Sequence, residues 1–483
     1  MTEPPGPGLD PDSMSYLGAA ESLVQRGTLR IPAAGWKDTD STTALGHFPP
    51  GFPLAIAAAV ALGAPPVQAA RGVEAAAAFA TVALAVSLVG AVAGTAAGAV
   101  AGVILLVTPS FAFDHWQVVS EPLCLALLMA TLALMSSGRR PWTYGLTAAA
   151  AGMVRYAAFS ATGAVALWAF GLRGSPRERT RRAVAAVAPS VLLQGLWVLR
   201  SLRESAEVRS FGLRGGLAAS FRELAGTLGA WLAPGVAAPW LGAVLAVAVG
   251  GAAGFAVVRA ARPPALEPRE PEAPLRRLLA AAGALAGCYA GLVLFSRMFV
   301  DLTIPFDQRI LSPFIVLAET AAVAAFASRW QRRRRGWRAA LAAAGVVWLG
   351  ASALATARAI ADALDGGWGY ASDETRASRI GAWLRGAGAG AELFSNDPAG
   401  VWFLTGRPSR DAPETLDADS LAAFGRVLRE RHGVLVGFPS ALEIGAPPDS
   451  LAARLGLAEV ARFPDGVAWG VPRAPAAAGT PGS

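Results

Sequence analysis

Residues 70–90 read ARGVEAAAAFATVALAVSLVG. Almost all of these side chains are small or apolar, and the length matches the roughly 20 residues that an α-helix needs to cross a membrane. Similar runs recur along the whole 483-residue chain, which is 54% hydrophobic. A water-soluble core could not bury them all, so the sequence predicts an integral membrane protein that is mainly α-helical.

Ten runs in total have the composition of membrane spans, although the second, fourth and fifth are short. They cover residues 70–90, 94–108, 119–135, 142–154, 157–172, 183–199, 240–258, 278–295, 310–327 and 339–357. We expect a polytopic bundle of about ten spans, in which Gly and Ala side chains let neighbouring helices approach closely. We also expect one further span upstream, missing from this sequence, because no hydrophobic helix precedes the first predicted outer loop.

Arginine clusters predict the orientation of the bundle. When ten spans alternate, the basic loops all fall on one side, which the positive-inside rule makes cytoplasmic: residues 139–140, 173–182, 259–277 and 329–338. The outer face then carries the opening segment, the loops at 109–118, 201–239 and 296–309, and the tail after residue 358. The net charge of +8 is mostly arginine and is not interleaved with aromatic residues on a basic surface, so we expect no nucleic-acid partner.

The pattern changes after residue 370. Helical spacing over residues 372–384 is followed by three short strand-like runs, at 392–395, 434–438 and 467–471, which end in turn signals. We therefore expect a small C-terminal extracytoplasmic α/β domain. The predicted regions are a first extracytoplasmic loop at 1–68, a transmembrane bundle at 69–358, the α/β domain at 359–472 and a disordered tail at 473–483.

Cysteine and histidine give little sign of a metal or disulfide framework. Cys124 and Cys288 lie inside apolar runs, where a thiol behaves as a small hydrophobe. The three histidines, His47, His115 and His432, lack the spacing of a zinc site. No cofactor is implied, and a divalent cation bound by carboxylates stays open.

Acidic residues at the predicted outer face are the first candidates for chemistry. Asp12, with Asp10 beside it, precedes an apparent helix over residues 16–26 that Gly27 closes. A carboxylate in such a loop could act as a general base, and helix capping is the alternative. Glu121 starts a predicted span shortly after Asp114 and His115, so these three side chains are candidates for contact with an acceptor or a metal. A favourable interaction of Glu121 with the helix dipole is the alternative there.

Three arginines lie at the predicted outer boundary, away from the cytoplasmic clusters. Guanidinium groups bind phosphate well, so Arg155, Arg200 and Arg309 predict a site for an anionic group. Snorkelling or pairing with a neighbour such as Asp307 is the alternative. Glu319 lies near mid-membrane, where we expect it to face the bundle interior.

Several short motifs occur in a consistent order and on a consistent predicted side. They are Asp12-Ser13-x-x-Tyr16, Trp36, Pro49-Pro50-Gly51-Phe52-Pro53-Leu54, Ala69-Ala70-Arg71, Ser120-Glu121-Pro122-Leu123, Arg155-Tyr156, Trp197-x-x-Arg200 and Asp307-x-Arg309-x-x-x-Pro313. Together they resemble the membrane glycosyltransferases of the GT-C superfamily, in particular the bacterial branch similar to protein O-mannosyltransferases and to the lipid A aminoarabinose transferase. The resemblance covers most of the chain, although no single motif is specific.

The resemblance implies a multi-pass enzyme of the bacterial inner membrane that transfers a hexosyl or pentosyl group from a polyprenyl-phosphate donor. The acceptor would be a lipid, a glycan or a protein on the extracytoplasmic face, with inversion at the sugar carbon. Asp12 would be the base, the three boundary arginines would bind the donor phosphate, and Glu121 would contact the acceptor or a metal. Where many relatives have a charged residue before the Pro-Pro run, this chain has His47-Phe48, so His47 or Lys37 would replace it.

Two other classes stay open from the sequence alone. A transporter or flippase of lipid-linked glycans would also need an arginine-lined path among membrane lipids, but its polar residues are expected near the midplane. Here the charged residues lie at the predicted boundary, and only Glu319 is deep. In the third, non-catalytic class, the tail would be a binding module on a membrane anchor.

Overall fold

The protein forms two compact units. The computed structural model describes residues 6–204, 212, 216–234, 240–244, 273–301, 304–330, 334–386, 390–439 and 446–472. One unit, called the α/β unit here, combines Met1–Leu45 with Asp365–Ser483, and the other, the helical unit, is Gly46–Leu364. The two ends of the sequence thus belong to the same unit.

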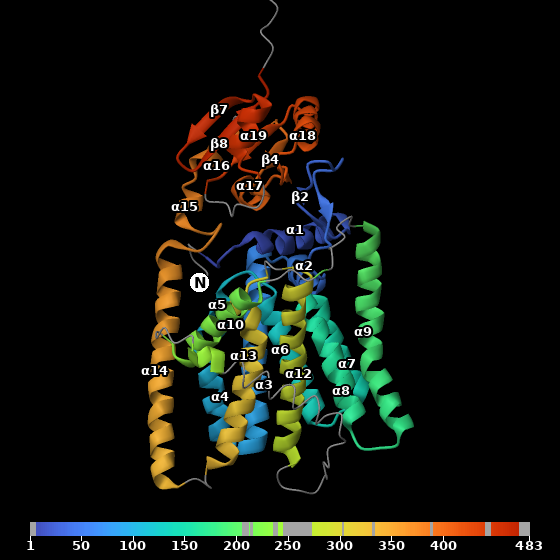
Figure 1. Ribbon diagram of the computed structural model, residues 1–483, viewed down its shortest axis with the longest axis vertical. Helices are drawn as coiled ribbons and strands as arrows, with labels where there is room; N and C mark the ends of the chain where they lie inside the picture. The colour runs from blue at the N-terminus through green and yellow to red at the C-terminus, as the bar shows by residue number, and fades with distance from the viewer. Residues whose placement is uncertain are drawn as a thin grey trace, which may run out of the picture. The chain divides into compact units, whose positions relative to one another are not determined.

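The helical unit is a bundle in which α3, α6, α12 and α13 lie centrally and α9 and α14 lie at the two sides (Figure 1). Its elements in chain order are α2 (Gly51–Ala61), α3 (Pro66–Ala93), α4 (Thr95–Val107), α5 (Pro109–Trp116), α6 (Glu121–Ser136), α7 (Pro141–Val154), the short 3-10 helix η1 (Tyr156–Phe159), α8 (Ser160–Gly171), α9 (Pro176–Glu204), α10 (Leu217–Leu232), α12 (Ala273–Phe299), α13 (Gln308–Ser328) and α14 (Arg335–Gly366).

Among the described residues, five helices are long and apolar enough to cross a membrane: α3, α9, α12, α13 and α14. The pair α4 and α5 is a sixth candidate, bent by 61° at its break. These helices support the predicted polytopic helical membrane protein. The number of about ten spans stays a prediction. The run at 240–258 lies mostly, and the tail at 473–483 entirely, outside the described residues.

The break between α4 and α5 lies at Thr108, directly before Pro109. Proline has no backbone N–H and disfavours helical backbone in the preceding residue, so α4 ends there and α5 begins with proline in its first turn. Most of the connection predicted at 109–118 is therefore helical. The connection predicted at 201–239 contains α10, and the place of both connections on the outer face stays a prediction.

Small residues pack the helices closely, as expected. A Cβ atom on Gly145 of α7 would lie 2.1 Å from the carbonyl oxygen of Ala186 in α9, and one on Gly98 of α4 would lie 2.5 Å from that of Val86 in α3. Both distances are far below van der Waals contact, so any larger residue at either glycine would push its helix away from the partner.

The α/β unit contains a two-stranded ribbon, a six-stranded sheet and short helices. Its elements in chain order are α1 (Pro11–Arg26), β1 (Arg30–Ile31), β2 (Ala33–Ala34), β3 (Thr43–Ala44), α15 (Asp373–Arg376), α16 (Arg379–Gly386), β4 (Leu393–Ser395), α17 (Pro398–Thr405), β5 (Ser409–Asp411), α18 (Ala418–Glu430), β6 (Val434–Gly437), α19 (Pro448–Leu455), β7 (Ala458–Phe463) and β8 (Gly466–Gly470).

The six-stranded sheet has the order β2-β5-β4-β6-β8-β7, and all neighbouring pairs are parallel except β6 with β8 and β8 with β7. The strands predicted at 392–395, 434–438 and 467–471 form β4, β6 and β8 to within one residue at each end. The sequence did not predict β2, which pairs in parallel with β5 and makes the N-terminal segment an edge of the sheet.

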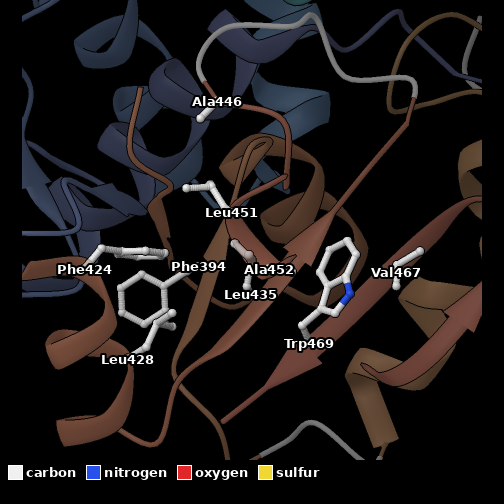
Figure 2. Packing of buried hydrophobic residues seen from close by; sticks show 9 residues of the cluster. All are labelled: Phe394, Phe424, Leu428, Leu435, Ala446, Leu451, Ala452, Val467 and Trp469. Carbon is white, nitrogen blue, oxygen red and sulfur yellow. The ribbon is translucent and has the colours of Figure 1, made fainter. Parts of the chain in front are cut away.

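Aromatic and aliphatic side chains fill one face of this sheet, between the strands and helices α18 and α19 (Figure 2). Phe394 of β4 packs edge-to-face against Phe424 of α18, with ring centroids 5.4 Å apart. Trp36, from the N-terminal segment, also packs edge-to-face against Phe424, with ring centroids 5.6 Å apart. The core therefore includes residues from both ends of the chain.

Candidate functional site

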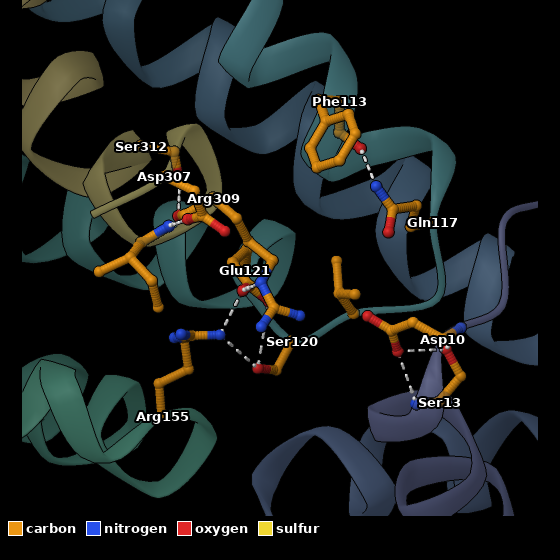
Figure 3. A network of polar contacts seen from close by, with 12 residues as sticks. Asp10, Ser13, Phe113, Gln117, Ser120, Glu121, Arg155, Asp307, Arg309 and Ser312 are labelled. Atoms are coloured by element: carbon orange, nitrogen blue, oxygen red, sulfur yellow. Dashed lines mark hydrogen bonds and ion pairs between the residues drawn. The ribbon is translucent and has the colours of Figure 1, made fainter. Parts of the chain in front are cut away.

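Glu121, the first residue of α6, is the centre of a buried ionic cluster in the helical unit (Figure 3). Its carboxylate Oε1 lies 2.5 Å from Nη1 of Arg155 and 3.2 Å from Nε of Arg309. The hydroxyl of Ser120 lies 3.5 Å from the second carboxylate oxygen and accepts a hydrogen bond from Arg155 at 3.3 Å. The structure thus brings together three of the residues that the sequence singled out.

Local backbone geometry directs Arg155 to this cluster. It ends α7 in an extended conformation (φ −142°, ψ 136°), because η1 begins directly after it. The next residue, Tyr156, is fixed on both sides: its hydroxyl donates to the carbonyl of Gly46 at 2.9 Å and accepts from the indole of Trp197 at 3.0 Å. Arg155 is therefore anchored by its neighbour.

Arg309 is placed by the start of α13. The preceding Asp307 is the N-cap of this helix, and its Oδ1 accepts the backbone N–H of Ile310 at 2.8 Å. This capping role explains the position of the Asp307 carboxylate, which the sequence offered as an alternative partner for Arg309. Arg309 lies in the first turn and is directed to Glu121.

Glu74 of α3 supports the turn that leads into α6. It is buried, and its Oε1 accepts the backbone N–H of Val119 at 3.0 Å. Sequence reasoning missed this role, because the partner is a backbone group 45 residues away and leaves no pattern in the side chains.

Asp114 adds a second buried carboxylate beside the cluster. It is fully buried on α5 and lies beside the hydroxyl of Ser312, which donates to the carbonyl of Arg309 at 2.9 Å. The neighbouring His115 turns its Nδ1 to the carbonyl of Phe111 at 2.6 Å. A buried carboxylate of this kind needs hydrogen-bond donors, which Ser312, a water molecule or a ligand group can supply.

The three side chains of the cluster are buried to different extents. The Glu121 side chain is 1% exposed, whereas Arg155 and Arg309 are 14% and 21% exposed. The two arginine side chains are thus more exposed than the carboxylate that orients them. Planar guanidinium groups fixed in this way suit the recognition of a phosphate or a carboxylate.

The other predicted donor-binding residues have separate surroundings. Arg200 pairs with Glu204 within α9 at 2.6 Å and stacks over Trp197. The ring of His47 packs edge-to-face on Phe48. Neither shows a contact with Glu121 among the described residues.

The acids and the lysine of the opening segment belong to the α/β unit. Asp10 is the N-cap of α1 and forms a reciprocal capping box with Ser13 (Figure 3). Asp12 lies one residue into this helix, which begins earlier than predicted and ends at Gly27 as expected. Lys37 lies over the ring of Trp36 at 4.8 Å. Their proximity to Glu121 stays a prediction.

In the part of the chain that the structure describes, no three His, Cys, Asp or Glu side chains gather in a way that could hold a metal ion. A divalent cation at Glu121 and Asp114 stays a prediction, because these two carboxylates would need further ligands. Contact with an acceptor hydroxyl makes no such demand.

No protein-family model matches the sequence, and no curated protein matches it. Two solved structures of ArnT from Cupriavidus metallidurans are similar to this chain. The one bound to undecaprenyl phosphate has 14% sequence identity and a TM-score of 0.44, and the match covers 96% of this chain and 94% of that chain. The apo structure has 15% identity and a TM-score of 0.44, with coverage of 96% and 93%.

Proposed function

We propose that this protein is a membrane glycosyltransferase that uses a sugar carried on polyprenyl phosphate. The observation that carries the proposal is the ionic cluster of Glu121, Arg155 and Arg309, in which the arginine side chains are more exposed than the carboxylate. Two fixed guanidinium groups suit a phosphate monoester or diester. The long apolar helices provide surroundings in which a polyprenyl chain would be soluble.

The chemistry follows from these charges. An acceptor hydroxyl attacks the sugar carbon that bears the phosphate, a new carbon–oxygen bond forms, and the bond to the phosphate oxygen breaks with inversion. The hydroxyl proton passes to a carboxylate, for which Asp12 is our candidate, and Asp10 is assigned to capping. Negative charge then develops on the leaving polyprenyl phosphate, where Arg155 and Arg309 stabilise it.

The remaining residues take supporting roles in this proposal. Glu121 fixes the two arginines, and Asp114 is our candidate for contact with the acceptor hydroxyl. The predicted orientation puts the reaction on the extracytoplasmic face of a bacterial inner membrane. The acceptor is a lipid, a glycan or a protein, and the sugar is a hexose or a pentose.

The test uses purified protein in nanodiscs, a panel of polyprenyl-phosphate sugars and mass spectrometry of the products. We expect a covalent product from at least one donor, and a fall in rate of about 100-fold or more for Arg155→Gln and Arg309→Gln. Arg462→Gln is the matched control, because Arg462 forms an exposed pair with Glu459. Uptake of a donor into sealed vesicles without any covalent product would overturn the proposal in favour of a transporter.

The assignment of the base has its own test. We expect Asp12→Asn to lower the rate by about 100-fold or more, because general-base catalysis typically contributes that much. Asp10→Asn keeps an oxygen that can cap α1, so its rate should stay near that of the parent. If the Asp12→Asn protein transfers sugar as fast as the parent, the base has been assigned to the wrong residue.

A further inference from the structure

Helix α10 carries a stripe of polar side chains on one face. Ser220, Glu223, Thr227 and Trp231 are spaced by three or four residues, so they line up along the helix. All four form hydrogen bonds to α12, to α13 or to the segment between them. A polar stripe within an apolar bundle is costly unless each group has a partner. Here every member of the stripe has one.

The first contact of the stripe is with Arg297, a buried residue near the end of α12. Its Nε donates to the hydroxyl of Ser220 at 2.8 Å, and its Nη2 pairs with Glu223 at 2.6 Å. Its Nη1 donates to the carbonyl of Ile304, in the segment that leads to α13. This guanidinium group therefore joins α10, α12 and the connection after α12.

The second contact is with Phe306, directly before the N-cap of α13. Its backbone N–H donates to Glu223 at 2.7 Å, and its carbonyl accepts from the hydroxyl of Thr227 at 2.5 Å. The guanidinium carbon of Arg297 lies 4.6 Å from the centre of the Phe306 ring. Both polar backbone groups and the ring of this single residue are thus held.

The third contact fixes the middle of α13. Glu319 faces the bundle interior, as the sequence predicted, and its Oε1 accepts from the indole of Trp231 at 2.8 Å. The hydroxyl of Thr108, at the break between α4 and α5, lies 2.8 Å from the same oxygen. Helix α10 therefore holds α13 at two points, before its first turn and near its centre.

We propose that Glu223 and Arg297 are positioning residues that set the place of Arg309 in the phosphate site. This inference rests on the proposed function. The contacts that Glu223 and Arg297 make with each other and with Phe306 are called the clamp here. Arg309 follows Phe306 by only three residues and belongs to the first turn of α13, which the clamp holds. A guanidinium group that must meet both Glu121 and a phosphate tolerates little displacement, and an error of an ångström can lower a rate about 100-fold. Neither positioning residue touches the phosphate itself.

The experiment is a double-mutant cycle with two readouts. Kinetics give kcat and the donor KM, and binding of undecaprenyl phosphate to protein in nanodiscs is measured separately. We expect Glu223→Ala to raise the donor KM and the dissociation constant about tenfold, with a smaller change in the acceptor KM. In the Arg309→Gln background the same substitution should change either quantity by less than about twofold, because the group that it positions is gone.

Thr227→Val is the milder variant. It removes one hydrogen bond to Phe306 and keeps the buried ion pair, so it should fold where Glu223→Ala does not, and raise the donor KM about threefold. Glu178→Ala is the matched control, because Glu178 forms an exposed pair with Arg182 within one helix. The temperature of unfolding is recorded for each variant.

The outcomes separate the two proposals. If the parent transfers sugar, but Glu223→Ala or Thr227→Val and Arg309→Gln act additively on KM and on binding, the clamp does not position Arg309 and the inference is overturned. If no protein transfers sugar, but undecaprenyl phosphate binds and the effects on binding are not additive, the clamp stands and the transfer reaction is wrong. Equal losses in every kinetic constant, matched by lower unfolding temperatures, would reduce the clamp to a purely structural role.

Discussion

Each unit of the molecule contains one glutamate held by two arginines, Glu121 in the helical unit and Glu392 in the α/β unit. The nitrogen–oxygen distances are similar, 2.5 and 3.2 Å around Glu121 and 2.5 and 3.0 Å around Glu392. The burial of the two carboxylates differs. Glu121 is 1% exposed and its arginines are 14% and 21% exposed, whereas Glu392 is 28% exposed, Arg410 is 1% exposed and Arg431 is 26% exposed.

The use of the guanidinium groups explains this difference. Besides Glu392, Arg410 donates to the carbonyl oxygens of Gly35, Asp38 and Thr39, at 3.3, 2.8 and 3.0 Å. It ties the N-terminal segment to the sheet. Two clusters of the same composition therefore differ in which side chain is most deeply buried. In one it is the carboxylate of Glu121, and in the other it is Arg410, whose bonds to backbone carbonyls hold the fold together.

The largest expected effect comes from making the same substitution in both clusters. Glu121→Gln should lower kcat/KM for the donor by about 100-fold or more, because two neighbouring guanidinium groups lose the charge that orients them. Glu392→Gln should leave kcat/KM near that of the parent, since this carboxylate is partly exposed and its loss is softened by solvent. Initial rates at several donor concentrations measure both. Equal losses in the two variants would remove the functional distinction between the clusters.

The next effect is on stability. Arg410→Gln should destabilise the α/β unit by about 1–3 kcal/mol, because backbone carbonyls lose a buried charged donor. Hydrogen exchange followed by mass spectrometry should show faster exchange in residues 33–39, which this arginine holds, and unchanged exchange in α6 and α13. Arg462→Gln, at an exposed pair on the same unit, should exchange like the parent. Unchanged protection of residues 33–39 would show that Arg410 is not the tie.

These two clusters also show how far the sequence could be interpreted. Arginines at the predicted outer boundary pointed to an anion site, and Arg155 and Arg309 do meet at Glu121. Composition could not separate them from Arg200, although a glutamate four residues later favours the local pair that Arg200 forms. The backbone contacts of Arg410 left no signal, because any residue can supply a carbonyl oxygen.

The fold shows the same limit. Long apolar runs and the strands β4, β6 and β8 have a local signature in hydrophobicity, and these elements were predicted. The two-residue strand β2 pairs with a strand more than 370 residues later, so nothing near it in the sequence indicates the pairing. Helix α10 lies in the stretch predicted as an outer loop, and its contacts with Phe306 and Glu319 are to residues distant in sequence, so nothing local indicates them.

The smallest expected effect concerns a third kind of carboxylate, Asp397, which a tyrosine hydroxyl and a backbone N–H hold instead of arginines. It caps α17, accepts from Tyr370 at 2.6 Å and from the N–H of Gly400 at 2.8 Å, and burial raises its pKa above the ordinary value of 3.8. The folded state therefore binds the proton more tightly than the unfolded state. The stability that this preference contributes is complete below pH 3.8 and is lost as the pH rises through the folded pKa.

Asp397→Asn removes that titration and keeps an oxygen for the cap. Relative to the variant, the parent should be more stable at pH 4 than at pH 7, and denaturant unfolding of both proteins at the two pH values measures the difference. The comparison between proteins cancels the titration of all other carboxylates. If the parent and the variant differ by the same free energy of unfolding at both pH values, burial does not raise the pKa of this carboxyl group.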